Sequence, residues 1–256
     1  MEQRTYEWKE ARRGLFTASG IYKLMGEKKY EYKYLYNNED ITYQKYNAML
    51  KKANEKNDSD ILNSLQKIEI SSSFSETGNT YILEKVTEAL GVDLNEVSTY
   101  AMQYGIDMEP HAKAYYEQSF NCSITDVGFI VAPWCNESGA SPDGIINNQK
   151  LIEIKCPFNP VHHTQNLLIK SAEDLKKLRP EYYWQVQHQM AVTEIYKCDF
   201  VSYCPAFISE INGKLSGINR MIAIEITANE IDIQLMKERI FEAVKIKHDL
   251  LNRIKL

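Results

Sequence analysis

The sequence predicts an α/β fold, and two features of its patterning support this prediction. Segments with apolar residues at helical spacing, such as "TYILEKVTEAL" (80–90), recur along the chain. Short apolar or alternating runs, such as "KLIEIK" (150–155), are typical of strands and lie between segments with helical spacing. At 256 residues the chain is long enough to bury a sizeable core, and we expect a single domain over residues 1–256 that carries an insertion.

Composition excludes several classes of protein. Hydrophobic residues make up 44% of the chain and charged residues 25%, as in average globular proteins, and no run approaches the ~18 apolar residues of a membrane span. The start, "MEQRTYEWKEARRG", lacks an apolar signal segment, so we expect a cytoplasmic protein without a membrane partner. The five cysteines form no C-x-x-C pair, which argues against a disulfide framework and a zinc site. The net charge of -5 would repel phosphate, so any DNA-binding surface must be local.

Two segments flank the expected core. Residues 27–75 are rich in Tyr, Lys and Asn, and we expect a polar insertion there, either a mobile loop or a solvated helical hairpin. Interleaved Tyr and Lys can also grip nucleic acid, although the acidic residues of this segment weaken that interpretation. A C-terminal helix is expected at about 229–254. Pro110 is expected to kink a helix or to mark a helix start at Glu109.

The stretch "SPDGIINNQKLIEIK" (141–155) brings acidic residues and a lysine together. Alternation along a strand puts Glu153 and Lys155 on one face, where we expect a cleft, and the two isoleucines between and before them on the core face. A two-residue turn at Asn147–Asn148 would place Asp143 on the wrong face. A three-residue turn, or a bulge at Gly144, would align Asp143 with Glu153, so we expect one of these.

Two carboxylates on one face repel each other unless a cation lies between them. A hard divalent ion such as Mg²⁺ suits carboxylate oxygens, a backbone carbonyl and water, and metal ions of this kind support phosphodiester hydrolysis. The competing interpretation is a half-buried strand with surface charges, because Asp, Glu and Lys also occur at this spacing by chance.

Four motifs decide between these interpretations. "SPDG" through "EIKCPF" contains P-D, nine residues and E-I-K, and is preceded by "RRGLFTAS" (12–19) and "GIDMEPHA" (105–112) and followed by "YYWQVQHQM" (182–190). In content and order these resemble the motifs of the YqaJ-type viral recombinase family, which includes the bacteriophage lambda exonuclease-like enzymes and belongs to the PD-(D/E)XK nuclease superfamily. The matches run from residue 8 to about 207, and the long stretch at 27–75 departs from the family pattern.

The resemblance implies a restriction-endonuclease-like fold, with a central mixed β-sheet flanked by helices, and assigns the site residue by residue. Metal binding falls to the carboxylates of Glu109, Asp143 and Glu153 and to the carbonyl of Ile154. Lys155 becomes the catalytic lysine, and Gln185 lines the site. The residues matching those that hold a terminal 5′-phosphate are Arg12, Ser19 and Ser141, with Arg13 as the alternative to Arg12.

The function implied by the resemblance is that of a Mg²⁺-dependent deoxyribonuclease. It would degrade linear double-stranded DNA from 5′-phosphorylated ends in the 5′-to-3′ direction and leave 3′ single-stranded tails for recombination by strand annealing. Two Mg²⁺ ions per site are expected, with Mn²⁺ able to substitute. The expected partners are DNA ends, two further copies in a homotrimer and a single-strand-annealing recombinase, in a bacterial host cell with a phage, prophage or viral origin. The alternatives are another PD-(D/E)XK repair or restriction endonuclease, and a non-catalytic DNA-end-binding module.

Overall fold

The structure, a computed structural model, describes residues 2–94, 99–207, 209–211, 214–216 and 219–255. The chain forms two compact units. The main unit consists of Met1–Met25 and Thr80–Leu256, and the inserted unit consists of Gly26–Asn79. No helix of the described residues is both long enough and apolar enough to cross a membrane.

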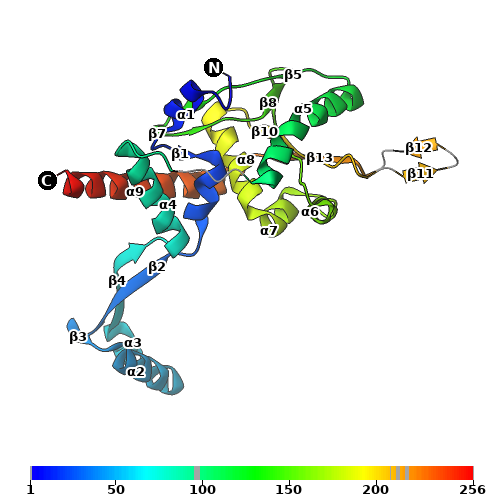
Figure 1. Cartoon of the computed structure of the whole chain (residues 1–256). Coiled ribbons are helices and arrows are strands. Elements are labelled where there is room, and N and C mark those ends of the chain that lie inside the picture. Colours follow the sequence, from blue (N-terminus) through cyan, green and yellow to red (C-terminus); the bar gives the residue numbers. More distant parts are fainter. Residues whose placement is uncertain (1, 95–98, 208, 212–213, 217–218, 256) are drawn as a thin grey trace. The chain divides into compact units, whose positions relative to one another are not determined.

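The larger sheet of the main unit has the strand order β13, β10, β9, β8, β5 (Figure 1). Strands β9 and β10 are parallel, whereas the other neighbouring pairs are antiparallel, so the sheet is mixed. Its bounds are Ile124–Thr125 (β5), Gly144–Ile146 (β8), Lys150–Lys155 (β9), Lys197–Tyr203 (β10) and Met221–Thr227 (β13). Strands β9 and β10 are buried over most of their length, as expected for strands covered on both faces.

A second sheet of the main unit has the order β1, β7, β6, with β1 and β7 parallel. These strands are Phe16–Thr17 (β1), Ile130–Ala132 (β6) and Cys135–Ala140 (β7). The chain passes from β7 into β8 of the larger sheet through three residues, Ser141 to Asp143. Asp143 therefore lies where the chain changes sheets. Strands β11 (Ser209–Ile211) and β12 (Lys214–Ser216) pair with each other.

Helices cover both faces of the larger sheet. On one face, Ile152 and Ile154 of β9 pack against Ala112 and Tyr116 of α5 (Tyr100–Phe120). On the other face, Glu153 contacts α8 (Pro180–Thr193), which is almost wholly buried between the sheets and its neighbouring helices. The remaining helices of the main unit are α1 (Tyr6–Arg12), the 3-10 helix η1 (Ala18–Met25), α4 (Glu76–Ala89), α6 (Pro160–Asn166), α7 (Ala172–Leu178) and α9 (Glu230–Ile254).

Helix α5 excludes one of the two expectations for Pro110. The helix begins after its N-cap Thr99 and runs through Pro110 to Phe120, so the expectation of a helix start at Glu109 is wrong and Pro110 lies inside the helix. Thr99 accepts a hydrogen bond from the amide of Met102, which satisfies one of the amides that a helix leaves unpaired at its first turn. The missing amide of Pro110 costs one hydrogen bond, and the buried contacts of Ala112 and Tyr116 with the sheet offset that cost.

The inserted unit contains an antiparallel sheet in the order β3, β2, β4 and two helices. The expectation of a loop or a helical hairpin is therefore wrong. Strand β2 alternates Tyr with other residues, which is the period of a strand, and Asn37 and Asn38 both have positive φ angles in the turn that follows. The elements are β2 (Lys29–Tyr36), β3 (Glu39–Ile41), α2 (Tyr43–Lys56), α3 (Ser59–Ser64) and β4 (Leu65–Ser73).

Candidate active site

The hairpin of β8 and β9 sets the position of Asp143. Gly144 pairs with Ile152 and Ile146 with Lys150, so the loop has three residues and Asp143 is in register with Glu153, as expected. Asn147 and Asn148 have φ angles of 48° and 59°, which Asn tolerates better than most residues. Asp143 Oδ2 accepts a hydrogen bond of 2.7 Å from the Ile154 amide.

Glu153 lies under helix α8 and is only 1% exposed, so it does not face an open cleft as the strand pattern suggested. Three donors surround its carboxylate: Lys155 Nζ at 2.5 Å, Gln185 Nε2 at 2.7 Å and Gln189 Nε2 at 2.6 Å. Gln185 and Gln189 are one helical turn apart on α8, so both reach the same carboxylate. A buried carboxylate is costly unless it is paired and hydrogen-bonded, and these donors meet that requirement.

Lys155 contacts both the Glu153 carboxylate and helix α8. Its Nζ also lies 3.2 Å from Gln185 Oε1 and 4.8 Å from the ring centroid of Tyr182. Burial alone would lower the pKa of Lys155, but the negative charges of Glu153 and Asp143 outweigh burial and raise it above its ordinary value. Lys155 is therefore a cation in this arrangement.

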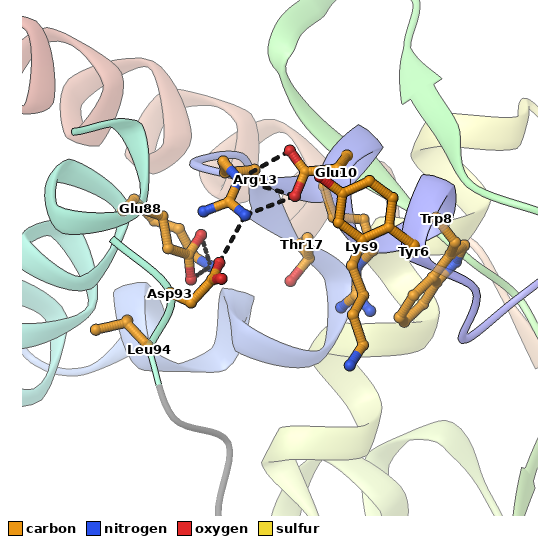
Figure 2. A pocket seen from close by; sticks show the side chains of 11 residues that line it. Tyr6, Trp8, Lys9, Glu10, Arg13, Thr17, Glu88, Asp93 and Leu94 are labelled. Carbon is orange, nitrogen blue, oxygen red and sulfur yellow. Dashed lines mark hydrogen bonds and ion pairs between the residues drawn. The ribbon is translucent and has the colours of Figure 1, made fainter. Parts of the chain in front are cut away.

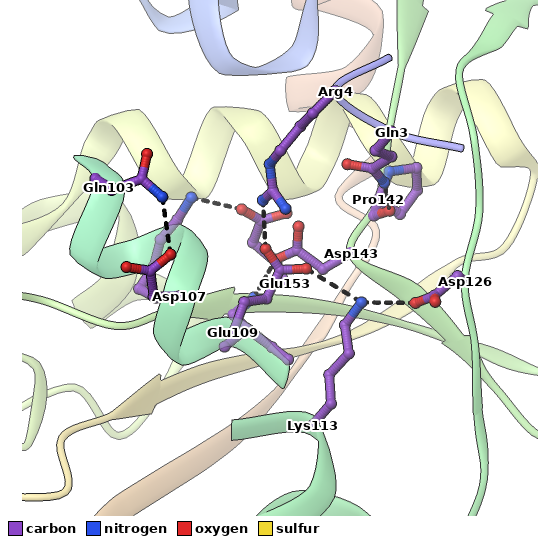
Figure 3. Close-up of polar contacts among 12 residues, drawn as sticks. Gln3, Arg4, Gln103, Asp107, Glu109, Lys113, Asp126, Pro142, Asp143 and Glu153 are labelled. Carbon is purple, nitrogen blue, oxygen red and sulfur yellow. Dashed lines mark hydrogen bonds and ion pairs between the residues drawn. The ribbon is translucent and has the colours of Figure 1, made fainter. Parts of the chain in front are cut away.

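Asp143 and Glu109 complete the acidic cluster (Figure 3). Burial and the negative charges of Glu153 and Glu109 raise the pKa of Asp143 well above its ordinary value. Glu109 comes from α5 and binds two cations, Arg4 at 2.5 Å and Lys113 at 3.1 Å. These contacts bring carboxylates from α5, β9 and the link before β8 to one place in the main unit.

Residues before α1 lie against this cluster. Gln3 Nε2 donates hydrogen bonds to the carbonyls of Val127 at 2.7 Å and Pro142 at 2.8 Å, and the neighbouring Arg4 reaches Glu109 (Figure 3). The sequence patterns did not point to Arg4, because an isolated arginine near the N-terminus carries no motif. Its position makes it a competitor for one of the carboxylates that a metal ion would use.

The donor chemistry of the cluster fits a hard divalent cation. Carboxylate oxygens are the ligands that Mg²⁺ and Mn²⁺ prefer, and a cation here would offset both the burial of Asp143 and the negative charges of Glu153 and Glu109. The described residues contain no group of three or more His, Cys, Asp or Glu side chains already arranged to hold a metal ion. The carboxylates pair with side chains of the chain itself: Arg4 and Lys113 bind Glu109, and Lys155 and two glutamines bind Glu153.

The residues matched to a phosphate site are only partly brought together. The guanidinium of Arg12 lies 3.8 Å from the ring centroid of Trp8, and Trp8 Nε1 donates a 2.8 Å hydrogen bond to Ser141 Oγ. Trp8 thus connects Arg12 to Ser141. Ser19 lies in η1 with an exposed side chain. Arg13 is held by Glu10 at 2.5 Å and Asp93 at 2.6 Å, and hydrogen bonds to these two carboxylates raise its pKa.

Arg12 lines a pocket of about 440 Å³. Figure 2 shows the ion pairs of Arg13 with Glu10 and Asp93 in this pocket. Its lining includes Lys85 of α4, which is only 8% exposed and which the sequence patterns did not single out. Burial lowers the pKa of Lys85, while its contact with Glu88 at 2.9 Å acts in the opposite direction. Lys85 lies inside an ordinary amphipathic helix pattern, so only the three-dimensional arrangement reveals that it lines the pocket.

Both peptide groups of the turn after Arg12 are fixed. The amide of Gly14 donates to Glu88 Oε2 at 2.9 Å, and its carbonyl accepts from Lys247 Nζ of α9 at 2.7 Å. Gly14 has a φ of +71°, and a Cβ there would lie 3.2 Å from the Cβ of Ala89. Helices α4 and α9 therefore hold the backbone that carries Arg12 and Arg13.

Comparison with known proteins adds to this geometry. Residues 7–196 match the YqaJ-like viral recombinase domain. No curated protein gives a significant match.

Three solved structures share the fold. Two are crystal structures of LHK-Exo, an alkaline exonuclease from Laribacter hongkongensis. The one in complex with dAMP has a TM-score of 0.69 at 26% identity, and the other has a TM-score of 0.68 at 25% identity; each comparison covers 98% of this chain and 96% of the other. A phage-related exonuclease from Haemophilus somnus 129PT has a TM-score of 0.62 at 15% identity over 94% of this chain and 96% of that one.

The mixed sheet flanked by helices is thus the restriction-endonuclease-like fold that the sequence predicts. The matching domain spans well over half of the chain and includes every residue of the acidic cluster. The chain belongs to the YqaJ-like viral recombinase family.

Proposed function

We propose that this chain, as a DNA exonuclease of its family, degrades one strand of linear duplex DNA in the 5′-to-3′ direction from 5′-phosphorylated ends, using Mg²⁺. The observation that carries the proposal is the contact of Glu153 with Lys155 and Gln185 beside Asp143, because it joins carboxylates, a cation and an amide at the end of one hairpin. Its products would be duplexes with 3′ single-stranded tails suited to recombination by strand annealing.

The metal ligands in this proposal are Glu109, Asp143, Glu153 and the carbonyl of Ile154. The Ile154 amide already points to Asp143, and in an extended strand the carbonyl of the same residue points to the same side. A divalent ion at these oxygens supplies activation of the attacking water and neutralisation of charge on the scissile phosphate. The family resemblance implies two Mg²⁺ ions per site, and Mn²⁺ accepts the same oxygen donors.

The other roles belong to the side chains of the chain itself. Lys155 carries a positive charge beside Glu153 and is placed to orient the attacking water and to stabilise negative charge on phosphate oxygens. Gln185 donates to Glu153 and accepts from Lys155, so it fixes the distance between the two. Gln189 holds the second oxygen of Glu153 and acts as a positioning residue.

End recognition is assigned to Arg12, Ser19 and Ser141. A guanidinium offers a planar pair of donors to phosphate oxygens, and the stacking of Arg12 on Trp8, which in turn bonds to Ser141, supports a common site for these two residues. The spacing of the matched motif assigns Arg12 rather than Arg13 to the phosphate.

The assembly and partners of the proposal follow the family resemblance. Double-stranded DNA ends are the substrate, three copies form a ring, and a single-strand-annealing recombinase receives the product. Residues 1–256 act as one nuclease domain, with 27–75 as its insertion and the terminal helix at about 229–254 as its last element.

A gel time course tests the proposal. Linear duplexes with 5′-phosphate or 5′-hydroxyl ends and a covalently closed circle are incubated with the protein in Mg²⁺ or in EDTA. We expect Mg²⁺-dependent loss of the 5′-phosphorylated strand, with the circle intact and the 5′-hydroxyl duplex degraded more slowly. Cutting of the circle would replace the proposal with an endonuclease, and binding without cleavage would replace it with a DNA-end-binding module.

A further inference from the structure

The inserted unit carries a continuous row of aromatic rings, which we call the tyrosine row: Tyr30, Tyr32, Tyr34, Tyr43 and Tyr46. The ring centroids of Tyr30 and Tyr32 are 6.2 Å apart and those of Tyr32 and Tyr34 are 6.4 Å apart. Tyr34 then contacts Tyr43 at 5.2 Å and Tyr46 at 4.9 Å. The row therefore follows one face of β2 and continues onto α2.

The row is more exposed than packing within the unit requires. Leu35 of β2 and Ala53 of α2 are buried, whereas Tyr30 at one end of the row is 45% exposed and Tyr43 at the other end is 55% exposed. Tyr34, between two rings of α2, has a clear packing role. Tyr30 is exposed and Tyr32 is half-buried, so the part of the row on β2 presents aromatic surface to solvent mainly at Tyr30.

Cations accompany the rings. Lys67 Nζ of β4 lies 3.7 Å from the ring centroid of Tyr32, and Lys28 Nζ lies 6.0 Å from that of Tyr30. Glu69 of β4 pairs in register with Tyr32, so an acidic residue also lies beside the row.

We propose that the inserted unit binds single-stranded DNA, with unpaired bases stacking on Tyr30 and Tyr32 and phosphates contacting Lys67. Aromatic rings interleaved with cations bind single strands without sequence preference, because every base has a π face. The ring spacing of 6.2 to 6.4 Å exceeds the ~3.4 Å between stacked bases of a duplex strand, so it suits an extended strand with separated bases. A duplex, whose bases already stack on each other, offers no such faces.

The proposal is independent of the catalytic assignment, since it concerns binding alone. The experiment uses the full chain in EDTA, where cleavage does not interfere, and measures fluorescence anisotropy of a labelled oligo(dT) and of a duplex of the same length. The test variant is Tyr30→Leu combined with Tyr32→Leu, and its matched control is Tyr30→Phe combined with Tyr32→Phe, which keeps the rings. We expect the Leu variant to bind oligo(dT) roughly tenfold or more weakly and the Phe variant to bind it as the unmodified chain does.

Charge variants test the same surface with effects of opposite sign. Lys67→Glu should weaken oligo(dT) binding, whereas Glu69→Lys should strengthen it, and both effects should shrink at high salt. Lys33→Glu is the control for charge, because Lys33 lies on the opposite face of β2 and pairs with Asp40 at 2.9 Å. Circular dichroism and thermal unfolding of each variant establish that the unit remains folded.

Two results would overturn the proposal. If the Leu variant is folded and binds oligo(dT) unchanged, the tyrosine row serves packing or a protein partner. If Leu and Phe variants lose oligo(dT) and duplex binding equally, the rings do not select unpaired bases. Cleavage of a short duplex in Mg²⁺, measured separately on the same variants, reports on the proposed nuclease and distinguishes its failure from failure of this inference.

Discussion

At the scale of single residues, Glu153 of the acidic cluster is a buried carboxylate that is held by three side-chain donors. Its strand alternation with Leu151, which is 0% exposed, places it on a face that α8 covers completely. A carboxylate in that position needs charged or hydrogen-bonding partners, and Lys155, Gln185 and Gln189 provide them. The same three side chains therefore stabilise the fold and fix the geometry of the cluster.

Lys155→Ala separates binding from cleavage. The substitution removes a cation but none of the proposed metal ligands, so DNA binding in EDTA should stay within about twofold while cleavage in Mg²⁺ falls by roughly 10²-fold or more. Lys150→Ala is the control, because Lys150 lies on the same strand but pairs with Asp199 at 2.8 Å. Gel-shift and single-turnover cleavage assays measure the two quantities. Normal cleavage by the Lys155 variant would remove it from the catalytic set.

Arg4→Ala should lower the Mg²⁺ concentration required for activity. Arg4 binds Glu109, which we propose as a metal ligand, so a metal ion must displace it. The arginine is 44% exposed, and exposed ion pairs contribute about 0–1 kcal/mol, so the half-saturating Mg²⁺ concentration should fall by only about two- to fivefold. Arg4→Lys, which keeps the charge, is the control. An unchanged Mg²⁺ requirement would mean that Arg4 does not compete for this site.

Arg12→Ala tests end recognition. Loss of the guanidinium should abolish the preference for 5′-phosphate over 5′-hydroxyl ends while leaving slow cleavage of 5′-hydroxyl duplexes intact. Lys9→Ala serves as a control, because Lys9 lines the same pocket without belonging to the matched motif. Initial rates on the two duplexes give the preference directly. An equal loss on both ends would give Arg12 a general role in DNA binding.

At the scale of elements, helices α4 and α9 hold the turn that carries Arg12. Glu88 of α4 binds the amide of Gly14, and Lys247 of α9 binds its carbonyl and also pairs with Glu137. Lys247 is 4% exposed, so its buried ammonium group relies on these partners for hydrogen bonds. Two helices remote from the motif in sequence therefore determine where the motif lies.

Lys247→Met should destabilise the chain and loosen the turn. The substitution leaves Glu137 with only His248 and frees the Gly14 carbonyl, so the free energy of unfolding should fall by about 1–3 kcal/mol. The preference for 5′-phosphorylated ends should fall as well, because Arg12 loses its fixed backbone. Lys245→Met, exposed on the same helix, is the control. Chemical denaturation and cleavage rates on both kinds of end measure these effects, and a normal end preference in the Lys247 variant would contradict the role of the turn.

The hairpin of β8 and β9 could be predicted closely because local chemistry limits its geometry. Alternation fixes the faces of β9, so the sequence predicts either a three-residue turn or a bulge at Gly144, and the structure has the three-residue turn, whose asparagines tolerate positive φ angles. The burial of Glu153 could not be predicted in the same way. It depends on α8, whose two glutamines are more than 30 residues away along the chain.

The strands of the inserted unit could be predicted from the sequence in principle, although the expectation of a loop or a helical hairpin is wrong. Its many charged residues favoured a solvated helix or loop, whereas the alternating tyrosines of β2 and the Asn37–Asn38 turn specify a hairpin. Polar composition outweighed periodicity in that prediction, although periodicity is the more direct signal of a strand. The placement of Arg4 and Lys85 depends on tertiary contacts alone, and no local pattern reports it.

At the scale of the whole molecule, the buried His188 makes the stability of the fold depend on pH. His188 of α8 is 0% exposed, and its Nε2 lies 2.8 Å from Ser138 Oγ of β7. Ser138 donates its own hydroxyl proton to the Phe16 carbonyl, so His188 Nε2 must be the donor in their contact. His188 Nδ1 is then an acceptor, and it has no partner among the described residues.

The neutral state of His188 makes stability depend on pH. Burial lowers its pKa to about 3, whereas in the unfolded chain it takes the ordinary value of about 6.5. Below about pH 6.5 the unfolded chain therefore binds a proton that the folded chain does not, and the sign of the linkage means that stability is complete above this pH and falls as the pH drops toward 3. The contribution is about 1.4 kcal/mol per pH unit within that window.

His188→Asn should flatten this dependence. Asn keeps a donor for Ser138 but does not titrate, so the variant should be less stable at pH 7.5 through lost packing, yet lose less stability than the unmodified chain between pH 7 and 5. His162→Asn is the control, since it makes the same change at an exposed histidine. Urea denaturation at several pH values measures the slopes. Other groups whose pKa differs between the folded and unfolded chain, such as His163, contribute equally to both slopes, so the difference isolates His188. Equal slopes would mean that His188 is accessible to protons in the folded state.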